Sequence, residues 1–566
     1  MPIRLFRPCV FSAAIVVILL PALSGCRSEL PDGRTGAGNS PGGEIRSDAK
    51  LDSAALLSLW REFREYQKPK VTAGVPDYTA AAMSAQKARI REFQDRLAAF
   101  DAAGRPIAER VDFEIVKAEL NGLAFDHRVL RPWSRDPSFY AVIEDSGPDV
   151  PAREGAQVFG CLCLSDYTFP LAGKDADTVR EKLAAIPGLL AQAKTNLIEP
   201  ARDLTVIGIR QKKNEAEDLA RLAERLSGSN PELVPLVETA RSAAGDFRAW
   251  LEAKLPGLNA PSGVGKAEFD WCQNRVHLVP YTWDEQVVLV ERELERSLSY
   301  LRLEEHRNRR LPPLPLPRSR EEQQTRLKKG IDEYFNFLKT SEIFEILPEM
   351  TLSDRVGPLV PPERLDFFAH VQYRDVLPLL AHSVHWLEKT REKRNAHPLR
   401  GTPLLYNIWD SRAEGFATAF EEMMMGAGMF DRNPRARELV YILLAFRAVR
   451  AMTDLMVHAN LWTLDDAIAY AVRATPRGWL KPDSGTIWTD LGIYLHQPGY
   501  GTSYVVGKVQ IEKLAADFSR LRGEPFVLKA FLEEMFSKGI IPQSLIRWEM
   551  TGLDDEMQKL GKGRLP

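Results

Sequence analysis

The sequence predicts a mainly α-helical protein with little or no sheet. In segment after segment, apolar residues recur three and four positions apart, which is the period of a helix with one buried face. Strand-like runs are few, and residues 204–209 are the best candidate for one. The chain has 566 residues, of which 45% are hydrophobic and 27% charged, so it can bury a large core. We therefore expect a large multi-helix body with one central cleft.

Helical patterns occur on both sides of a proline-rich break. The segments that show them are, in chain order, residues 54–67, 78–100, 107–127, 177–196, 214–226, 231–254, 283–307 and 438–461. Residues 133–155 are rich in Pro, Asp and Ser and predict an irregular loop. Residues 311–318 contain four prolines and cannot be helical, because proline cannot continue a helix. This break divides the body into an N-terminal helical part, residues 51–310, and a C-terminal helical part, residues 319–566, which would carry the site.

The first 25 residues indicate a bacterial lipoprotein signal peptide. Basic residues precede an apolar run, 11–20, that is too short to span a bilayer, and Leu23-Ser24-Gly25-Cys26 follows it. This tetrapeptide is typical of a lipobox, in which the chain is cut before Cys26 and that cysteine carries lipid. A plain secretory signal that is cut elsewhere is the alternative.

Residues 26–50 consist mostly of Gly, Ser, Pro and charged residues, with almost no large apolar side chain. We expect a flexible tether here, between the lipid on Cys26 and the folded body. The residue after the cysteine is Arg27 and not Asp, which favours the periplasmic face of the outer membrane. The membrane would thus be one partner of this cell-envelope protein, reached through its N-terminal lipid.

The charge balance gives no indication of a nucleic-acid partner. The chain has 75 basic and 77 acidic residues, so its formal net charge is −2. After the signal peptide and Cys26, the remaining cysteines are Cys161, Cys163 and Cys272, an odd number. A disulfide between Cys272 and one of the other two stays open, as does the oligomeric state.

Four clusters of polar residues in the C-terminal part are candidates for chemistry. In the first cluster, His382, His385 and Glu388 stand three apart, so one helix would present them on adjacent turns of one face. Two imidazoles and a carboxylate suit zinc. The alternative is a polar helix face that carries two incidental histidines.

The second cluster is centred on Glu414, at the start of an apolar segment. Ser411 and Glu414 have the spacing of a capping box, which would satisfy the first backbone N–H groups of a helix. The functional alternative is a carboxylate that binds a metal or a substrate.

The third cluster is a polar stripe on an otherwise apolar helix. Arg447, Arg450, Asp454 and His458 recur every three or four residues and therefore share one face. Since buried charges need partners, this stripe suggests either a polar internal cleft or an ion-paired seam between helices.

The fourth cluster surrounds Tyr504. A Pro-Gly turn at 498–499 precedes it, and Tyr504 and Lys508 share a helix face. A phenol near a metal can donate a hydrogen bond to a developing oxyanion. The alternative is an ordinary helix start packed against the core.

These clusters, in this order, resemble the bacterial family of domain-of-unknown-function 885 (DUF885) proteins, which look like zinc metallopeptidases of the gluzincin type. The resemblance is carried by Ala413-Glu414-Gly415-Phe416, by the stretch from Arg447 through His458 to Thr463, by Pro498 through Tyr504 to Lys508, and by residues 541–545. It implies a gluzincin-like helical body and makes Glu414 the expected third zinc ligand.

The family's motif His-Glu-x-x-Pro-Gly-His-His, which supplies two zinc ligands and the catalytic Glu, is missing from this chain. One alignment places residues 374–378 on it and removes both ligands. The other places His382-Ser383 on His-Glu, which keeps one ligand, replaces the base by Ser383 and puts Glu388 at the second His. His382, Glu388 and Glu414 would then hold zinc, with His385 as an alternative ligand.

The sequence thus favours a divergent metal-dependent hydrolase of peptides. We expect His458 and Tyr504 to stabilise the tetrahedral oxyanion, and Arg447 or Arg450 to hold a substrate carboxylate. The base that would activate water is not identified, and Glu421 and Glu422 are the remaining nearby carboxylates on that helix. The alternative is a non-catalytic descendant that binds peptides or envelope partners in the same cleft.

Overall fold

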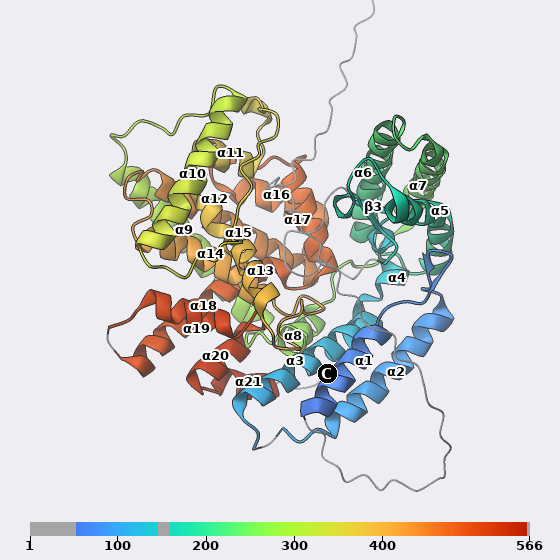
Figure 1. Ribbon diagram of the computed structural model, residues 1–566, viewed down its shortest axis with the longest axis horizontal. Coiled ribbons are helices and arrows are strands. Elements are labelled where there is room, and N and C mark those ends of the chain that lie inside the picture. The colour runs from blue at the N-terminus through green and yellow to red at the C-terminus, as the bar shows by residue number, and fades with distance from the viewer. Residues whose placement is uncertain (1–52, 103, 145–158, 524, 563–566) are drawn as a thin grey trace, which may run out of the picture.

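The computed structural model describes residues 53–102, 104–144, 159–523 and 525–562, and its described part is mainly helical (Figure 1). The signal peptide, Cys26 and the tether lie outside the described residues. Within the described ranges, no helix has the length and apolar character that crossing a bilayer requires.

The elements follow one another in a simple order. The α-helices are α1 (Ser53–Tyr66), α2 (Ala80–Ala98), α3 (Ile107–Phe125), α4 (Pro132–Arg135), α5 (Gly173–Asn196), α6 (Arg202–Leu226), α7 (Val234–Lys254), α8 (Lys266–Arg275), α9 (Trp283–Arg307), α10 (Arg320–Thr340), α11 (Phe367–Arg374), α12 (Leu377–His382), α13 (Val384–Arg394), α14 (Asp410–Gly426), α15 (Ala436–His458), α16 (Leu464–Ala474), α17 (Gly485–His496), α18 (Tyr500–Arg522), α19 (Leu528–Ser537), α20 (Gln543–Thr551) and α21 (Asp555–Lys562). The short turns are a π-turn, η1 (Asp126–Leu130), and the 3₁₀ turns η2 (Pro137–Tyr140), η3 (Leu164–Asp166), η4 (Pro231–Leu233), η5 (Leu255–Gly257), η6 (Pro362–Arg364) and η7 (Pro476–Gly478). The described strands are β1 (Val71–Thr72), paired antiparallel with β2 (Val75–Pro76), and β3 (Ile143–Glu144), paired parallel with β4 (Leu162–Cys163).

Local sequence signals place several helices correctly. α9 spans the predicted range, and it begins at a capping box in which the Thr282 side chain accepts from the Glu285 backbone N–H and Glu285 bonds back to Thr282. The strand predicted at 204–209 is wrong, because these residues belong to α6. A short apolar run can be a strand or the buried face of a helix. Here Leu204 and Ile207 belong to a 25-residue helix, and their side chains are buried in the protein core.

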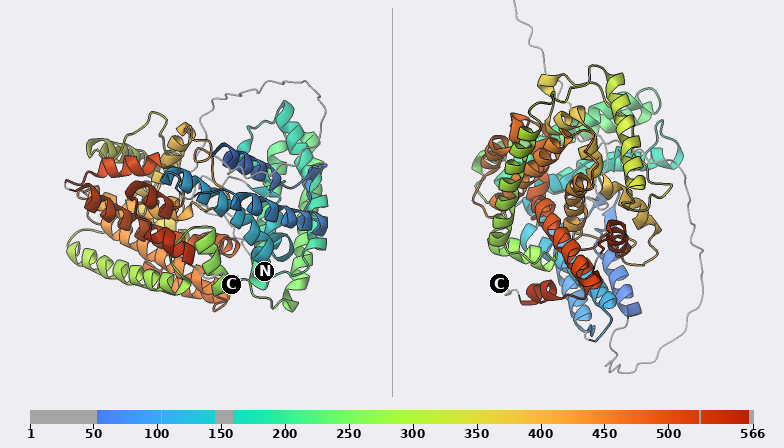
Figure 2. Two further views of the ribbon diagram at one scale, coloured as in Figure 1. Left: turned by 90° about the horizontal axis from the view of Figure 1, so that it is seen from below. Right: turned by 90° about the vertical axis from the view of Figure 1, so that its left-hand side faces the viewer.

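The helices form a large body and a smaller lobe, which stand apart in Figure 1; the small lobe lies at the right of the left-hand view of Figure 2 and behind the large body in its right-hand view. The small lobe consists of α5, α6 and α7, whose apolar faces enclose one core together with η2 and the β3–β4 pair. The large body has its own core, to which α1–α3 contribute together with helices from α8 to α21. The N-terminal helices α1–α3 therefore pack with the C-terminal part, while the division at residues 311–318 stays a prediction.

α15 lies at the centre of the large body. Almost every residue from Ala436 to His458 is buried, because α9, α14, α16, α17 and α18 pack around this helix. A buried helix must satisfy each polar side chain that it carries. The polar stripe of α15 therefore determines which neighbouring groups can surround it.

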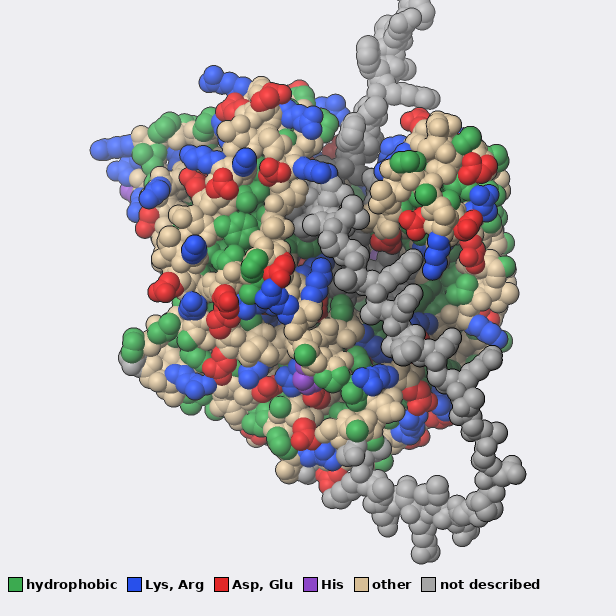
Figure 3. Space-filling view, viewed as in Figure 1, with side chains coloured by type: hydrophobic (Ala, Val, Ile, Leu, Met, Phe, Trp, Pro, Cys, Tyr) green, Lys and Arg blue, Asp and Glu red, His purple; other side chains and the backbone are tan. Residues whose placement is uncertain are grey.

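On the face shown in Figure 3, acidic and basic side chains are interspersed over both the large body and the small lobe. Cys161, Cys163 and Cys272 are buried, and they form no disulfide in the described structure.

Candidate metal centre

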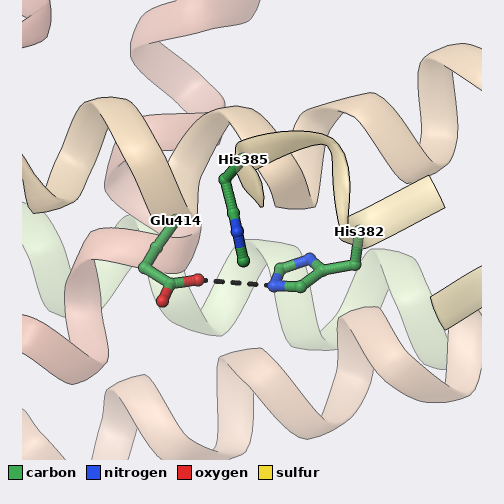
Figure 4. A group of neighbouring side chains, drawn as sticks. All are labelled: His382, His385 and Glu414. Carbon is green, nitrogen blue, oxygen red and sulfur yellow. Dashed lines mark ion pairs between the residues drawn. The ribbon is translucent and has the colours of Figure 1, made fainter. Parts of the chain in front are cut away.

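Three side chains from separate helices meet inside the large body. His382 is the last residue of α12, His385 lies in the first turn of α13, and Glu414 belongs to α14. One potential ligand atom from each residue lies within 4.8 Å of the other two, and Figure 4 shows the three side chains converging. Two imidazole nitrogens and a carboxylate oxygen form a ligand set that zinc accepts. We call these three residues the His-His-Glu group.

A break between α12 and α13 permits this arrangement. Ser383 separates the two helices, and its hydroxyl donates to the Leu380 carbonyl at 2.6 Å. His382 and His385 therefore approach Glu414 from two helix ends, and not from one face of a single helix as expected.

Glu388 lies outside the group, contrary to the prediction. Its buried carboxylate accepts two hydrogen bonds from the Arg412 guanidinium, at 2.5 and 3.0 Å. Because a buried ion pair of this kind already compensates its charge, Glu388 is not available as a ligand.

A close crossing of α14 and α18 positions Glu414. A Cβ atom on Gly415 would lie 2.3 Å from the Cα of Gly507, so glycine is needed where the two backbones touch. This contact brings Tyr500, in the first turn of α18, against Glu414, and its hydroxyl donates to Oε1 at 2.8 Å. Glu414 therefore faces the group and does not cap α14, so the capping-box alternative is wrong.

The group contains buried atoms without hydrogen-bond partners. Within the described structure, neither His385 Nδ1 nor Glu414 Oε2 makes a hydrogen bond. Burial lowers the pKa of His385 to about 3, so this imidazole is neutral. Burial opposes ionisation of Glu414, but its contacts with His382 and with the Tyr500 hydroxyl outweigh burial and lower its pKa to about 2. A neutral imidazole and an ionised carboxylate, both buried, are groups that a cation would satisfy.

Glu421 and Arg447 contact His382 at Nδ1, the ring nitrogen that does not face Glu414. His382 Nδ1 lies 2.8 Å from Glu421 Oε1, and Arg447 donates to both oxygens of Glu421, at 2.5 and 3.1 Å. Arg447 Nη2 also lies 3.0 Å from Nδ1. The shorter contact, to a carboxylate that only accepts, favours the tautomer with its proton on Nδ1. This arrangement leaves the lone pair of Nε2 directed at Glu414 Oε2, 3.3 Å away.

Tyr504 lies beside the group. Its ring is roughly parallel to that of His382, with 6.4 Å between centroids. The Arg450 guanidinium lies over the Tyr504 ring at 4.5 Å and donates to Asp490 at 3.1 Å.

The positions of Arg447 and Arg450 do not support the prediction that one of them holds a substrate carboxylate. Both are buried, and each has a carboxylate partner within the protein, Glu421 and Asp490 respectively. A substrate would have to break one of these ion pairs, so we assign the two arginines to positioning Glu421 and Tyr504.

His458 lies away from the His-His-Glu group. It follows Arg447 by 11 residues, which is about 16 Å along a helix axis. Its Nε2 lies 2.7 Å from the Tyr494 carbonyl oxygen, and the side chain is fully buried beside Phe269. The predicted oxyanion role of His458 has no support in this geometry.

Asp454 lies near His458 on the α15 stripe and bonds to the start of α18. Its carboxylate accepts from the backbone N–H groups of Gly499 and Thr502, at 3.3 and 3.0 Å, and so caps the start of α18. This half of the stripe is the seam between helices that was the alternative to a polar cleft.

The sequence did not identify Tyr500 as part of the site, and it did not reveal the partners of the carboxylates Glu421 and Glu422. Tyr500 precedes Tyr504 by one helical turn, and that spacing could have identified it. Glu421 contacts His382 and Arg447, so it is an outer partner of the group and not a free base. Glu422 forms ion pairs with Arg296 at 2.7 Å and Lys508 at 3.2 Å, away from the group.

The sequence between α13 and α20 matches a known family. Residues 394–550 match the model described as "Bacterial protein of unknown function (DUF885)". Residues 394–550 are a DUF885 domain. This stretch contains Glu414, the stripe of α15 and Tyr504, whereas His382 and His385 precede it. The predicted resemblance is thus confirmed over this range, which contains the second, third and fourth clusters and not the first.

Two solved structures share the fold over most of the chain. A protein from Shewanella oneidensis, described as a candidate lipoprotein of unknown function, superposes with a TM-score of 0.64 at 17% identity, covering 88% of this chain and 100% of that one. A candidate lipoprotein from Colwellia psychrerythraea gives a TM-score of 0.64 at 14% identity, covering 89% and 99%. A search of curated proteins gave no match. At these identities the likeness shows the fold alone.

A cavity of about 380 Å³ lies elsewhere, between the small lobe and α17. Its walls come from α4, η2 and α6 on one side and from α17 on the other. None of the residues predicted as catalytic, metal-binding or substrate-binding lines it.

Proposed function

We propose that this DUF885 protein binds a divalent metal, zinc fitting best, at His382, His385 and Glu414, and that it is a metal-dependent hydrolase of peptides. One observation carries the proposal. Nδ1 of His382 faces Glu421, so its Nε2 lone pair and the ionised Glu414 carboxylate stand 3.3 Å apart. Two electron pairs at this distance call for a positive charge between them, and His385 adds a third donor.

The surrounding residues fit the roles that such a centre needs. Glu421 would orient His382 as an outer carboxylate, and Arg447 would hold Glu421 in place, since metal-bound histidines commonly donate their other N–H to a carboxylate. Tyr500 would orient Glu414 through its 2.8 Å hydrogen bond. Tyr504, beside His382, would offer its hydroxyl to a developing oxyanion. A bound zinc ion would supply Lewis acidity, polarising a carbonyl oxygen and acidifying a water ligand.

The experiment is hydrolysis of a mixed peptide library by the purified protein with zinc, after EDTA treatment, and after zinc is returned. We expect cleavage that EDTA abolishes and zinc restores, and that Glu414→Gln lacks. His458→Gln is the matched control, because this buried histidine lies outside the group, and it should retain cleavage. Cleavage that survives both EDTA and Glu414→Gln would contradict the proposal.

A second candidate function is binding of peptides or envelope partners without catalysis. Ser383 favours it, because in the alignment that keeps His382 as a ligand this residue stands where the family's motif has its catalytic Glu, and its hydroxyl is bonded to the Leu380 carbonyl. Stoichiometric zinc with peptide retention but no cleavage would select this candidate over the hydrolase.

We also propose that the chain is anchored in the cell envelope by lipid on Cys26, on the periplasmic face of the outer membrane. The residues Leu23 to Cys26 support the anchor, as does the description of both structural neighbours as candidate lipoproteins. Labelled palmitate should be incorporated into the wild type and not into Cys26→Ser, and incorporation into the variant would overturn the anchor.

A further inference from the structure

The cavity between the small lobe and α17 has the size of a site for a small organic molecule. Its volume, about 380 Å³, falls within the range of about 300–1,000 Å³ that ligand pockets occupy. α6 and α17 contact each other beside it, and Figure 1 shows α17 on the side of the large body that faces the small lobe. The cavity therefore lies where two separately packed units meet, which is a common place for a binding site.

Two guanidinium groups that form no ion pair with the described residues line this cavity. Arg210, on α6, lies over the Trp488 ring of α17 at 4.6 Å and makes no hydrogen bond or ion pair with the described residues. Arg135 donates to the carbonyls of Val129 and Pro261, at 3.2 and 2.9 Å, and likewise has no ion pair within the described ranges. Burial lowers the pKa of both guanidinium groups, and the charges of Asp483 on Arg210 and of Asp136 and Glu199 on Arg135 offset this only in part.

The acidic groups of the cavity are already engaged. Asp136 accepts from the Ser138 backbone N–H at 2.8 Å and lies 3.2 Å from His496 Nε2. Glu144, at the end of β3, also lines the wall and has a partner. The carboxylates of the wall thus have partners of their own, whereas its two guanidinium groups form no ion pair with the described residues.

The rest of the wall is largely apolar. Phe139, Leu204, Ile207 and Ile493 contribute side chains that come from η2, α6 and α17. An apolar wall beside unpaired guanidinium groups fits a molecule with an apolar body and an anionic end, because arginine binds carboxylates through two parallel hydrogen bonds.

We propose that this cavity is a second binding site, distinct from the His-His-Glu group, for a small carboxylic acid with an aromatic or aliphatic body. Arg210 binds the carboxylate with Arg135 in support, and the apolar wall takes up the body. The site is independent of the metal centre, since the two share no lining residue.

The test uses a pair of probes that differ only in charge. N-acetyl-L-phenylalanine and its amide are titrated into the full-length protein by ligand-observed NMR, in EDTA so that no bound metal contributes. We expect the carboxylate to bind at least about tenfold more tightly than the amide, the effect of one charge-assisted hydrogen bond. Arg210→Gln should abolish this preference.

Arg221→Gln is the matched control, because Arg221 lies on the same helix α6 but is exposed and paired with Asp218. It should keep the full preference for the carboxylate. Circular dichroism and thermal unfolding verify that both variants fold. Equal binding of the two probes to the wild type, no binding of either, or a preference that survives in folded Arg210→Gln would each overturn the proposal.

Discussion

Both ends of the α15 stripe consist of buried polar side chains, yet the two ends serve different purposes. At one end, Arg447 and Arg450 face carboxylates that support the His-His-Glu group and Tyr504. At the other end, Asp454 and His458 bond to backbone groups of α18 and α17. The first end contacts residues of the proposed metal centre, and the second attaches helices to one another.

The difference teaches that burial and residue type do not identify a site. His385 and His458 are both buried, and burial lowers the pKa of each, to about 3 and about 4 respectively. Each has an Nδ1 without a hydrogen bond in the described structure. Only His385 has a second imidazole and a carboxylate oxygen within 4.8 Å. The convergence of donors separates the two histidines.

The largest expected effect is a difference in zinc affinity between a variant of the His-His-Glu group and a variant of the other end of the stripe. Glu414→Gln keeps an oxygen for the Tyr500 hydroxyl but removes the charge, so zinc affinity should fall by more than the 10–100-fold that loss of an outer partner typically costs. His458→Gln should leave zinc affinity unchanged. Competition with a fluorescent zinc chelator measures both affinities, and equal losses in the two variants would erase the distinction.

Asp454→Ala should have the opposite profile. It leaves buried N–H groups at the start of α18 without an acceptor, so we expect the free energy of unfolding to fall by about 3 kcal/mol. Asp466→Ala, at the exposed start of α16, should cost only about 1 kcal/mol. Urea unfolding gives both values. A loss at Asp454 no larger than at Asp466 would show that the seam is not structural.

Glu421→Gln tests whether Glu421 supports the His-His-Glu group through His382. The amide cannot supply the negative charge that holds the Nδ1 proton of His382, so zinc affinity should fall about 10–100-fold, less than for Glu414→Gln. The same competition assay ranks the two variants. An unchanged affinity would exclude Glu421 from the centre.

Protonation of His458 should make the free energy of unfolding depend on pH. Burial lowers the pKa of His458 to about 4, below the ordinary 6.5, so the unfolded chain gains its proton first as the pH falls. His458 therefore costs stability progressively from pH 6.5 towards pH 4, by about 2 kcal/mol near pH 5. The difference in unfolding free energy between wild type and His458→Gln should shrink accordingly on acidification. A difference that is constant with pH would contradict this assignment.

The sequence predicts most of the fold because its signals are local. The apolar period and the Thr282–Glu285 capping box define α9, and four prolines exclude helix from 311–318. Residues 204–209 were mistaken for a strand because six apolar-rich residues cannot reveal the helix that continues beyond them.

The site is predicted in part, for the same physical reason. His382, His385, Glu414 and Tyr504 could be proposed from residue type and order. Glu388 was wrongly included because its partner, Arg412, lies 24 residues away and joins it only in the folded chain. The break at Ser383, which turns His385 towards Glu414, likewise depends on tertiary packing.

The most direct test of the central claim is anomalous X-ray diffraction at the zinc edge from crystals of the protein grown with zinc. We expect one strong anomalous peak between His382, His385 and Glu414, which is absent from crystals of Glu414→Gln. A wild-type crystal without a peak at this position, or with its strongest peak beside His458, would contradict the assignment.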